Sequence, residues 1–307
     1  MSTDLYAVVT ARIVAALEAG TPPWSCPWRR SGVDPRPANI TTSRLYRGIN
    51  VLLLNLRCQA EGFNHNRWLT FSQAQGLGAR VRRGETGTQI VFFKLHELDA
   101  ERDLREERDD AQRRVVPLLR AFTVFNVDQI EGLPEGMAPA PVPRADWEPI
   151  EVAERLLDTS GAVIRHGGSK AFYAPGPDVI QMPPTSAFDA SGDYYATALH
   201  ELTHWTGHPS RCNRPLGMRH GIDAYAFEEL VAEMGAAFLT DYCGLVGRMQ
   251  HASYVASWLQ ALRNDKRLIF GAASLAQKAA DFLLPVPTEL LPAAQASESA
   301  STEAEAA

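Results

Sequence analysis

His200-Glu201-Leu202-Thr203-His204 is the most informative sequence in this chain of 307 residues. Two histidines four residues apart lie one above the other on one face of a helix. Both imidazoles can then bind one metal ion, and the glutamate beside the first histidine can act as a general base toward a metal-bound water. The pattern therefore predicts a metal site on a helix, provided that the surrounding sequence supports both the helix and a third ligand.

The surrounding sequence favours the helix. The segment 193–206 contains no proline or glycine, and apolar residues recur in it. Gly207 supplies a C-terminal stop, and Pro209 prevents continuation. A third histidine at the metzincin spacing would have to stand at Ser210, so that route to a third ligand is excluded.

A glutamate on a later helix is the other route to a third ligand. The segment 225–242 is predicted to be that helix, and it contains Glu228, Glu229 and Glu233 among apolar residues. We expect Glu229 to bind the metal, and Glu233 to hold a histidine ring in position from outside the ligand set. Glu228 stays open as the alternative ligand.

If the site is catalytic, peptide hydrolysis is the predicted reaction, and the sequence does not name the substrate. Glu201 would take the proton of the attacking water and deliver it to the leaving amine. Four residues could donate a hydrogen bond to the oxyanion, and the sequence leaves the choice open: Tyr194, Tyr195, His220 and Tyr225. The alternative is a structural metal site without catalysis, but such sites usually have four protein ligands.

The formal net charge of −6 conceals a division along the chain. Residues 1–95 hold twelve Lys and Arg against five Asp and Glu, a formal charge of +7, and the remainder carries −13. Such asymmetry indicates that one half meets a polyanion. We find no signal-peptide pattern and no run of membrane-spanning length. The four cysteines are scattered, which fits a reducing, cytoplasmic location.

Proline-rich composition predicts the domain boundary. Five prolines fall within residues 133–149, so this stretch is expected to be an extended linker. The expected domains are then 1–132 and 150–285, followed by a disordered tail at 286–307 that is rich in Ala, Ser and Glu. Residues 101–114 are almost all charged, and we expect a mobile insertion between strands at 89–94 and 115–127.

Helical patterns precede strand patterns in the N-terminal region. Residues 4–19 and 50–60 are predicted helices, and Thr70 with Gln73 forms a capping-box pattern that opens a third. Strand patterns follow from residue 89, which together indicates an α+β domain.

Aromatic residues alternate with arginines in this N-terminal region. Arginine binds phosphates and aromatic faces stack on unpaired bases, so the mixture predicts binding of single-stranded rather than duplex DNA. The alternative is that the tryptophans belong to the core and the arginines to a solvated surface. The candidate DNA-binding residues are Trp24, Trp28, Arg29, Arg30, Arg44, Tyr46, Arg47, Asn50, Trp68, Arg80, Arg82 and Arg83.

Several of these motifs together resemble those of the ArdC antirestriction proteins. In the N-terminal region they are Pro23-Trp24, Pro27-Trp28, Thr42-Ser43-Arg44-Leu45-Tyr46-Arg47-Gly48-Ile49-Asn50, Arg67-Trp68-Leu69-Thr70-Phe71 with Gln73-Ala74, Arg83-Gly84-Glu85 and Val124-Phe125-Asn126-Val127-Asp128-Gln129. In the C-terminal region they are His200 to Gly207, Glu228 to Glu233 and Tyr254 to Lys278.

The resemblance implies an N-terminal α+β domain that binds single-stranded DNA and a mainly helical C-terminal metallopeptidase domain of the zincin type with a small sheet. It also implies a plasmid-borne protein that shields incoming conjugative DNA from restriction. The expected cofactor is Zn²⁺ or another divalent ion such as Mn²⁺. The expected partners are single-stranded DNA and, as possible targets, DNA-bound proteins or restriction enzymes. The alternative function is a DNA-recruited zinc metalloprotease acting on DNA-bound proteins.

Overall fold

The computed structural model describes residues 4–20, 24, 36–97, 115–137, 149–215, 222–245 and 255–284. The expected insertion at 101–114 and the expected tail at 286–307 lie outside these residues, as does most of the expected linker. Among the helices in the described ranges, none has both the length and the apolar character needed to cross a bilayer.

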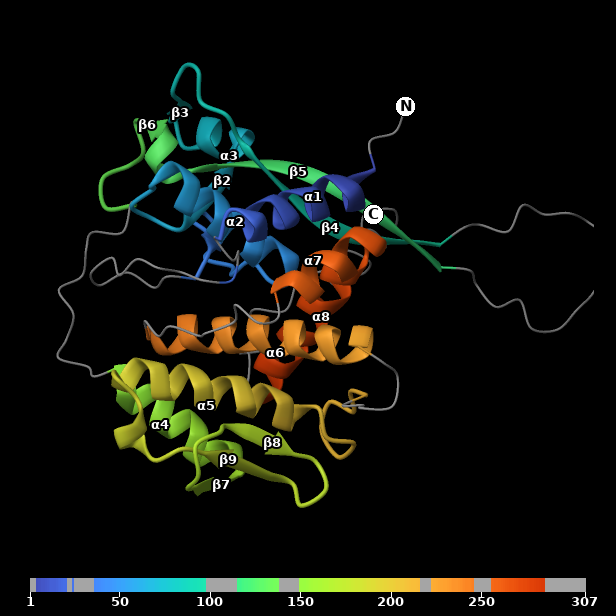
Figure 1. Ribbon diagram of the computed structural model, residues 1–307. Helices are drawn as coiled ribbons and strands as arrows, with labels where there is room; N and C mark the ends of the chain where they lie inside the picture. Colours follow the sequence, from blue (N-terminus) through green and yellow to red (C-terminus); the bar gives the residue numbers. More distant parts are fainter. Residues whose placement is uncertain are drawn as a thin grey trace, which may run out of the picture.

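The N-terminal half (residues 4–137) combines three helices with a four-stranded sheet (Figure 1). The strand order is β1-β2-β5-β4; β1 runs parallel to β2, and the other two pairings are antiparallel. A separate pair joins β3 to β6. The elements are α1 (Leu5–Glu18), β1 (Ala38–Asn39), α2 (Ile49–Glu61), β2 (Arg67–Thr70), α3 (Phe71–Gly76), β3 (Arg80–Val81), β4 (Thr88–Glu97), β5 (Val115–Asn126), the 3-10 turn η1 (Val127–Gln129) and β6 (Ile130–Glu131).

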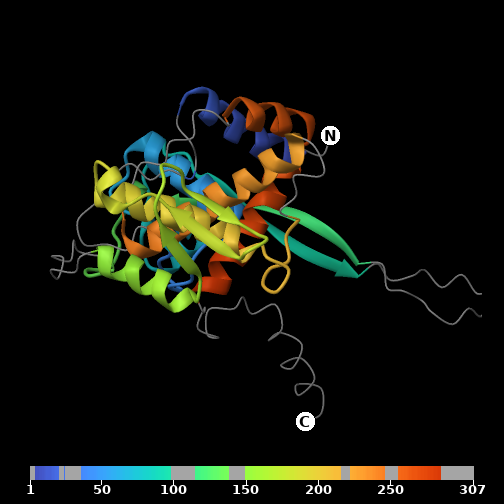
Figure 2. The same cartoon turned by 60° about the horizontal axis from the view of Figure 1, so that its bottom comes forward.

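Local signals account for the ends of several of these elements. Thr70 and Gln73 form both hydrogen bonds of the capping box that opens α3, as predicted. The C-cap of α2 is Gly62, whose φ of 65° lies in the left-handed region that glycine adopts without a steric penalty. Strands β4 and β5 pair from Thr88 opposite Val124 to Glu97 opposite Val115, and their far end extends away from the other described elements (Figures 1 and 2).

The C-terminal half (residues 149–284) is mainly helical, with one three-stranded sheet of order β7-β9-β8. Helices α5 and α6 pack against each other; α8 packs on α6, and β8 and β9 lie against α5. The elements are α4 (Pro149–Ser160), β7 (Val163–His166), β8 (Phe172–Ala174), β9 (Val179–Met182), the 3-10 turn η2 (Thr185–Ala187), α5 (Ser191–Thr206), α6 (Ile222–Cys243), α7 (Val255–Asn264) and α8 (Leu268–Leu283). The predicted α+β class is therefore confirmed, and the two helices predicted for the metal site are present.

The two halves share one hydrophobic core. The largest buried cluster joins Ile13 of α1 and Leu52 of α2 to Leu230 of α6 and Ile269 of α8. Helix α1 packs on α7, and the indole rings of Trp24 and Trp258 meet edge to face with centroids 5.5 Å apart. The expected boundaries at 132 and 150 stay a prediction, but the buried surface continues across them.

Candidate metal centre

Helix α5 presents both histidines on its buried side toward α6. His200 and His204 are one turn apart, and their ring centroids lie 4.9 Å from each other. Both side chains are mostly buried, with exposed fractions of 13% and 12%. Neighbouring α5 residues such as Leu199 and Leu202 are completely buried, so packing fixes the orientation of the helix and of its two imidazoles.

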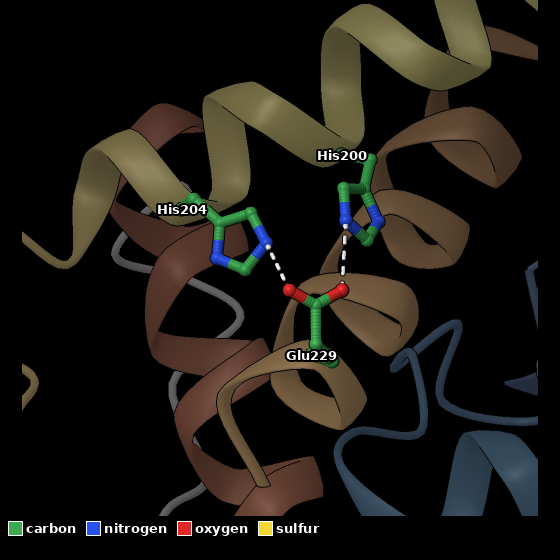
Figure 3. Close-up of side chains that lie close together, drawn as sticks. All are labelled: His200, His204 and Glu229. Carbon is green, nitrogen blue, oxygen red and sulfur yellow. Dashed lines mark ion pairs between the residues drawn. The ribbon is translucent and has the colours of Figure 1, made fainter. Parts of the chain in front are cut away.

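Glu229 of α6 faces both imidazoles (Figure 3). Its Oε2 lies 3.6 Å from His200 Nε2, and its Oε1 lies 3.6 Å from His204 Nε2. One ligand atom from each of these three residues falls within 4.8 Å of the others. The two histidines and this glutamate therefore form a candidate metal site between two helices.

The spacing of these atoms leaves room for a metal ion between the two imidazoles and the carboxylate. A separation of 3.6 Å exceeds the normal range for N–H···O bonds. Tetrahedral donors about 2.1 Å from a zinc ion lie about 3.4 Å from one another. Two imidazoles and one carboxylate are also the ligand set of catalytic zinc sites. The residues present thus suit a divalent ion that retains a position for water.

Two other carboxyl groups lie on the far sides of the rings. Glu233 Oε1 lies 3.4 Å from His200 Nδ1, and Glu228 Oε1 lies 3.2 Å from His204 Nδ1. Such carboxylates fix the tautomer and orientation of a ligating imidazole, leaving Nε2 for the metal. In this arrangement Glu228 supports His204 from behind, whereas Glu229 stands where a third ligand is needed.

A buried arginine, which the sequence interpretation missed, completes the support of His204. Arg214 has a side-chain exposure of 1% and donates to both carboxylate oxygens of Glu228, at 3.1 and 2.8 Å. It also donates to Thr206 Oγ1 and to the carbonyl oxygen of Thr203 at the end of α5. Nothing in the local sequence pattern indicates this residue, because its partners lie 8 to 14 residues away in the chain.

Burial and ion pairing compete at this site. Burial opposes a charge on His200 and His204, but the nearby carboxylates of Glu229 and Glu228 respectively raise the pKa of each imidazole above its usual value. Burial alone would raise the pKa values of Glu228 and Glu229, yet the histidines, and for Glu228 also Arg214, lower both. Burial raises the pKa of Glu233 to about 8. Glu228 and Glu229 thus favour ionisation, which is the state in which a carboxylate binds metal.

Glu201 is buried on α5 beside His200, with 7% of its surface exposed. Among the candidate oxyanion donors, Tyr194 and Tyr195 already bond His166 at 2.8 Å and Glu154 at 2.5 Å. Tyr225 is 47% exposed, and a hydrogen bond from it helps to lower the pKa of Glu229. Tyr225 is therefore a candidate donor in contact with a proposed metal ligand, while His220 lies outside the described residues.

The structure divides the candidate DNA-binding residues into groups. Trp24, Asn50 and Trp68 are 2%, 6% and 0% exposed. Trp68 lies in a hydrophobic cluster, and Asn50 bonds the backbone of Val91 through both ends of its amide. These three side chains are structural here, because none has a free face for a base; the corresponding expectations are corrected.

The remaining candidates lie nearer the surface. Arg44, Arg80, Arg82 and Arg83 have solvent-accessible side chains, although Arg80 pairs with Glu131 at 2.6 Å and Arg82 with Glu85 at 3.0 Å. Tyr46 and Arg47 are half-buried, and Arg47 pairs with Asp281 of α8. Trp28, Arg29 and Arg30 lie outside the described residues.

Two histidines on one helix and a glutamate on the next, beside a small sheet, define the zincin class of metallopeptidase-like proteins. Residues 151–275 match the family described as zincin-like metallopeptidase, and residues 3–125 match the N-terminal domain of anti-restriction factor ArdC. The chain belongs to the ArdC antirestriction family and carries a zincin-like metallopeptidase domain.

Solved structures and curated relatives agree with this assignment. The chain is 42% identical to the antirestriction ArdC protein of plasmid R388, covering 92% of this chain and 97% of that one. The TM-score is 0.75 for its metal-free crystal structure and 0.73 for its Mn(II)-bound structure. The chain is also 42% identical to protein y4eC of Sinorhizobium fredii, covering 92% of each.

Two DNA primases named TraC from Escherichia coli are 42% and 40% identical to this chain over 90% and 91% of its length. This chain spans only 26% and 20% of those primases.

Proposed function

We propose that this protein binds single-stranded DNA through its N-terminal half and protects incoming conjugative plasmid DNA from restriction, with a metal-dependent peptidase centre in its C-terminal half. The protein acts in the cytoplasm in this proposal. The observation that carries the enzymatic part is the convergence of the His200 and His204 Nε2 atoms on the two oxygens of Glu229, each at 3.6 Å. The family assignment supports the antirestriction part.

His200, His204 and Glu229 would hold the ion, Zn²⁺ or Mn²⁺; the R388 ArdC structure was solved with Mn(II). Such an ion, when bound, supplies Lewis-acid chemistry that polarises a carbonyl and makes water more acidic. Glu201 accepts the proton of the attacking water and delivers it to the leaving amine. Glu228 and Glu233 lie beside the two Nδ1 atoms, at 3.2 and 3.4 Å, and would hold the rings so that the Nε2 atoms face Glu229. Tyr225 donates to the oxyanion.

The proposed DNA surface consists of Arg44, Arg80, Arg82 and Arg83, whose side chains are all accessible to solvent. Ile40 and Val81 pack on the same hydrophobic cluster, so the loop that carries Arg44 and the strand beside Arg82 belong to one end of the N-terminal half. Accessible guanidinium groups bind the phosphates of any strand regardless of sequence. This composition supports affinity for the DNA backbone that falls with added salt.

Glu201→Gln tests the enzymatic part. The variant should still take up Zn²⁺ or Mn²⁺, because the three proposed ligands are unchanged, but should lose cleavage of a DNA-bound protein. Glu151→Gln on the exposed side of α4 is the matched control and should behave as wild type. Wild-type cleavage by Glu201→Gln would reject Glu201 as the base. Wild-type protein that takes up neither metal would reject the metal centre.

The DNA part is tested by Arg44→Ala combined with Arg83→Ala. Binding of a labelled 20-nucleotide single strand should weaken, and the slope of log affinity against log salt should fall by about one for each phosphate that is no longer bound. Arg165→Ala, at an exposed arginine on β7 of the C-terminal half, is the control. An unchanged salt slope in the double variant would remove these arginines from the DNA surface.

A second candidate function is a metalloprotease that DNA merely recruits to its protein substrates. The ligand set favours it, since two histidines and one glutamate leave a position open for water, as catalytic zinc sites do and closed structural sites do not. The two functions differ in one assay: protection of transferred DNA in vivo is lost in Glu201→Gln if proteolysis carries the effect, and is retained if DNA binding does.

A further inference from the structure

A cavity of about 330 Å³ lies where the loop before α2 meets the C-terminal ends of α6 and α8. Both halves of the chain line it. Helix α8 packs on α2 of the N-terminal half as well as on α6, so it is placed to contact both halves. The volume lies within the range of small-ligand pockets in proteins.

The two sides of the cavity carry opposite charges. The N-terminal half contributes Arg36 and Arg47, and the C-terminal half contributes Asp241 of α6 and Asp281 of α8. Both aspartates stand in the last turn of their helices, where the helix dipole adds partial negative charge. Arg47 and Asp281 pair with each other across the cavity, so a ligand must add hydrogen-bond donors to the carboxylate oxygens and a negative group to the guanidinium groups beside this existing pair.

The cavity also has an aromatic rim and an apolar interior. Tyr242 is 42% exposed, and Arg36 Cζ lies 5.3 Å from the centre of its ring. Leu45, Val51 and Phe238 line the interior. These surfaces suit a flat ring system, because an aromatic face gains from stacking and the apolar wall gains from being covered.

Hydrogen bonds already hold the walls in place. Gln277 Nε2 donates to Asp281 Oδ1 at 3.1 Å, and Gln277 Oε1 accepts from the backbone N–H of Gly48 at 2.9 Å. Arg47 pairs with the other oxygen of Asp281. The cavity is thus a preformed junction, which reduces the cost of ordering it around a ligand.

A nucleobase within a DNA strand has the required chemistry. Its ring is flat, its edge carries N–H donors for a carboxylate, and its phosphates suit the arginine side. Cytosine, adenine and guanine carry an exocyclic amine, whereas thymine has none and flanks its single ring N–H with two carbonyl oxygens, which the aspartates would repel. Arg44, on the proposed DNA surface, directly precedes the lining residues Leu45 and Tyr46, so a strand bound there leads to the cavity.

We propose that this cavity receives one unstacked base of single-stranded DNA and selects bases that carry an exocyclic amine over thymine. The inference rests on the proposed function, since it needs a bound single strand. It adds a base-reading site to phosphate contacts that by themselves carry no sequence information.

The test measures fluorescence anisotropy of labelled 20-nucleotide strands of three kinds: all cytosine, all thymine and abasic. Wild type should bind the cytosine strand more tightly than the thymine strand. Tyr242→Ala should weaken cytosine-strand binding about tenfold, the usual scale of one stacked base, and change abasic-strand binding less than about twofold. Asp241→Asn should remove the preference for cytosine over thymine, because an amide can also donate to a carbonyl.

The control is Phe172→Ala, which removes a similarly exposed ring from β8, in the small sheet of the C-terminal half. Circular dichroism and metal uptake verify that each variant is folded. Tyr242→Ala binding all three strands as wild type does, or wild type lacking any preference between cytosine and thymine, would overturn the base pocket while leaving the proposed function intact. Wild type binding none of the strands would instead reject the proposed function, and this inference with it.

Discussion

Among single residues, the adjacent glutamates Glu228 and Glu229 show that a shift of one position along a helix separates a metal ligand from a supporting side chain. The side chains of neighbouring helical residues project about 100° apart, so only one of them can face the gap between His200 and His204. Glu229 takes that position, and Glu228 instead lies between His204 Nδ1 and Arg214. We expect the two to differ sharply when neutralised.

Glu229→Gln should therefore reduce metal affinity far more than Glu228→Gln. Loss of a supporting carboxylate typically costs about 10–100-fold in affinity, whereas loss of Glu229 removes one of only three protein ligands. Competition of each variant with a chromophoric chelator for Zn²⁺ measures both effects, with Glu151→Gln as the control. Stronger loss in Glu228→Gln than in Glu229→Gln would reverse the assignment of ligand and support.

Asp178, which lies away from the metal site, predicts that the stability of the protein depends on pH. Hydrogen bonds from Arg211, at 2.6 and 3.0 Å, hold the pKa of Asp178 at about 2, below its usual 3.8. A lowered pKa means that the stabilisation is complete above about pH 4 and is lost as the pH falls toward 2. Since the side chain of Asp178 is 37% exposed, the contribution is small, about 0.2–1 kcal/mol.

Asp178→Asn should thus lower the free energy of unfolding at pH 6, and the difference from wild type should shrink between pH 4 and pH 2. Asparagine tolerates the positive φ of 55° at this position, so the substitution changes charge without adding backbone strain. Urea titrations at pH 6, 4 and 3 provide the measurement. A difference that stays constant over this range would show that the ion pair is not its source.

At the scale of elements, the metal site depends on how closely α5 and α6 approach. A Cβ atom added at Gly235 of α6 would lie 2.4 Å from Thr203 Cγ2 of α5, well inside van der Waals contact. Thr203 lies beside His204, and Gly235 lies two residues after Glu233. The spacing of the two helices at this point therefore also sets the spacing of the histidines and the carboxylates.

Gly235→Ala should force the helices apart and weaken metal binding together with stability. Overpacking of this kind typically costs about 1–3 kcal/mol. Adding Thr203→Ala removes the opposing methyl group and should restore most of the metal affinity. Thermal unfolding and chelator competition on both single variants and the double variant provide the measurement, and a double variant as impaired as Gly235→Ala would contradict a steric cause.

Elements with strong local patterns were predictable from the sequence, and contacts between distant residues were not. The helices of the two metal-binding segments and the capping box at Thr70 follow from periodicity and short-range hydrogen bonds. The burial of Trp68 and the role of Asn50 in bonding Val91 depend on how α2 and the sheet pack, which no local pattern encodes. Arg214 escaped prediction for the same reason.

At the scale of the whole molecule, the continuous core implies that the two halves are energetically coupled. Ile13 of α1 is fully buried in the same cluster as Trp258 of α7, and Thr10 donates to the backbone carbonyl of Lys266 at 2.7 Å. Helix α7 and the metal-bearing helix α6 also pack on each other. A substitution that destabilises α1 should therefore also destabilise the metal centre, because α7 and α6 connect the two by packing.

Ile13→Ala, far from the metal ligands in sequence, should then lower the temperature of zinc release as well as the temperature of helix loss. Deleting a buried isoleucine side chain costs about 2–5 kcal/mol, which corresponds to roughly 3–8 °C in a chain of this size. Circular dichroism follows the helices, and a chromophoric chelator follows release from the zinc-loaded protein. Arg12→Ala, at an exposed position on the same helix, controls for changes in helix propensity.

If the halves unfold independently, zinc release keeps its wild-type midpoint while the helical signal shifts. If they share one cooperative core, both midpoints fall together, because the helices that hold the ion lose the surface against which they pack.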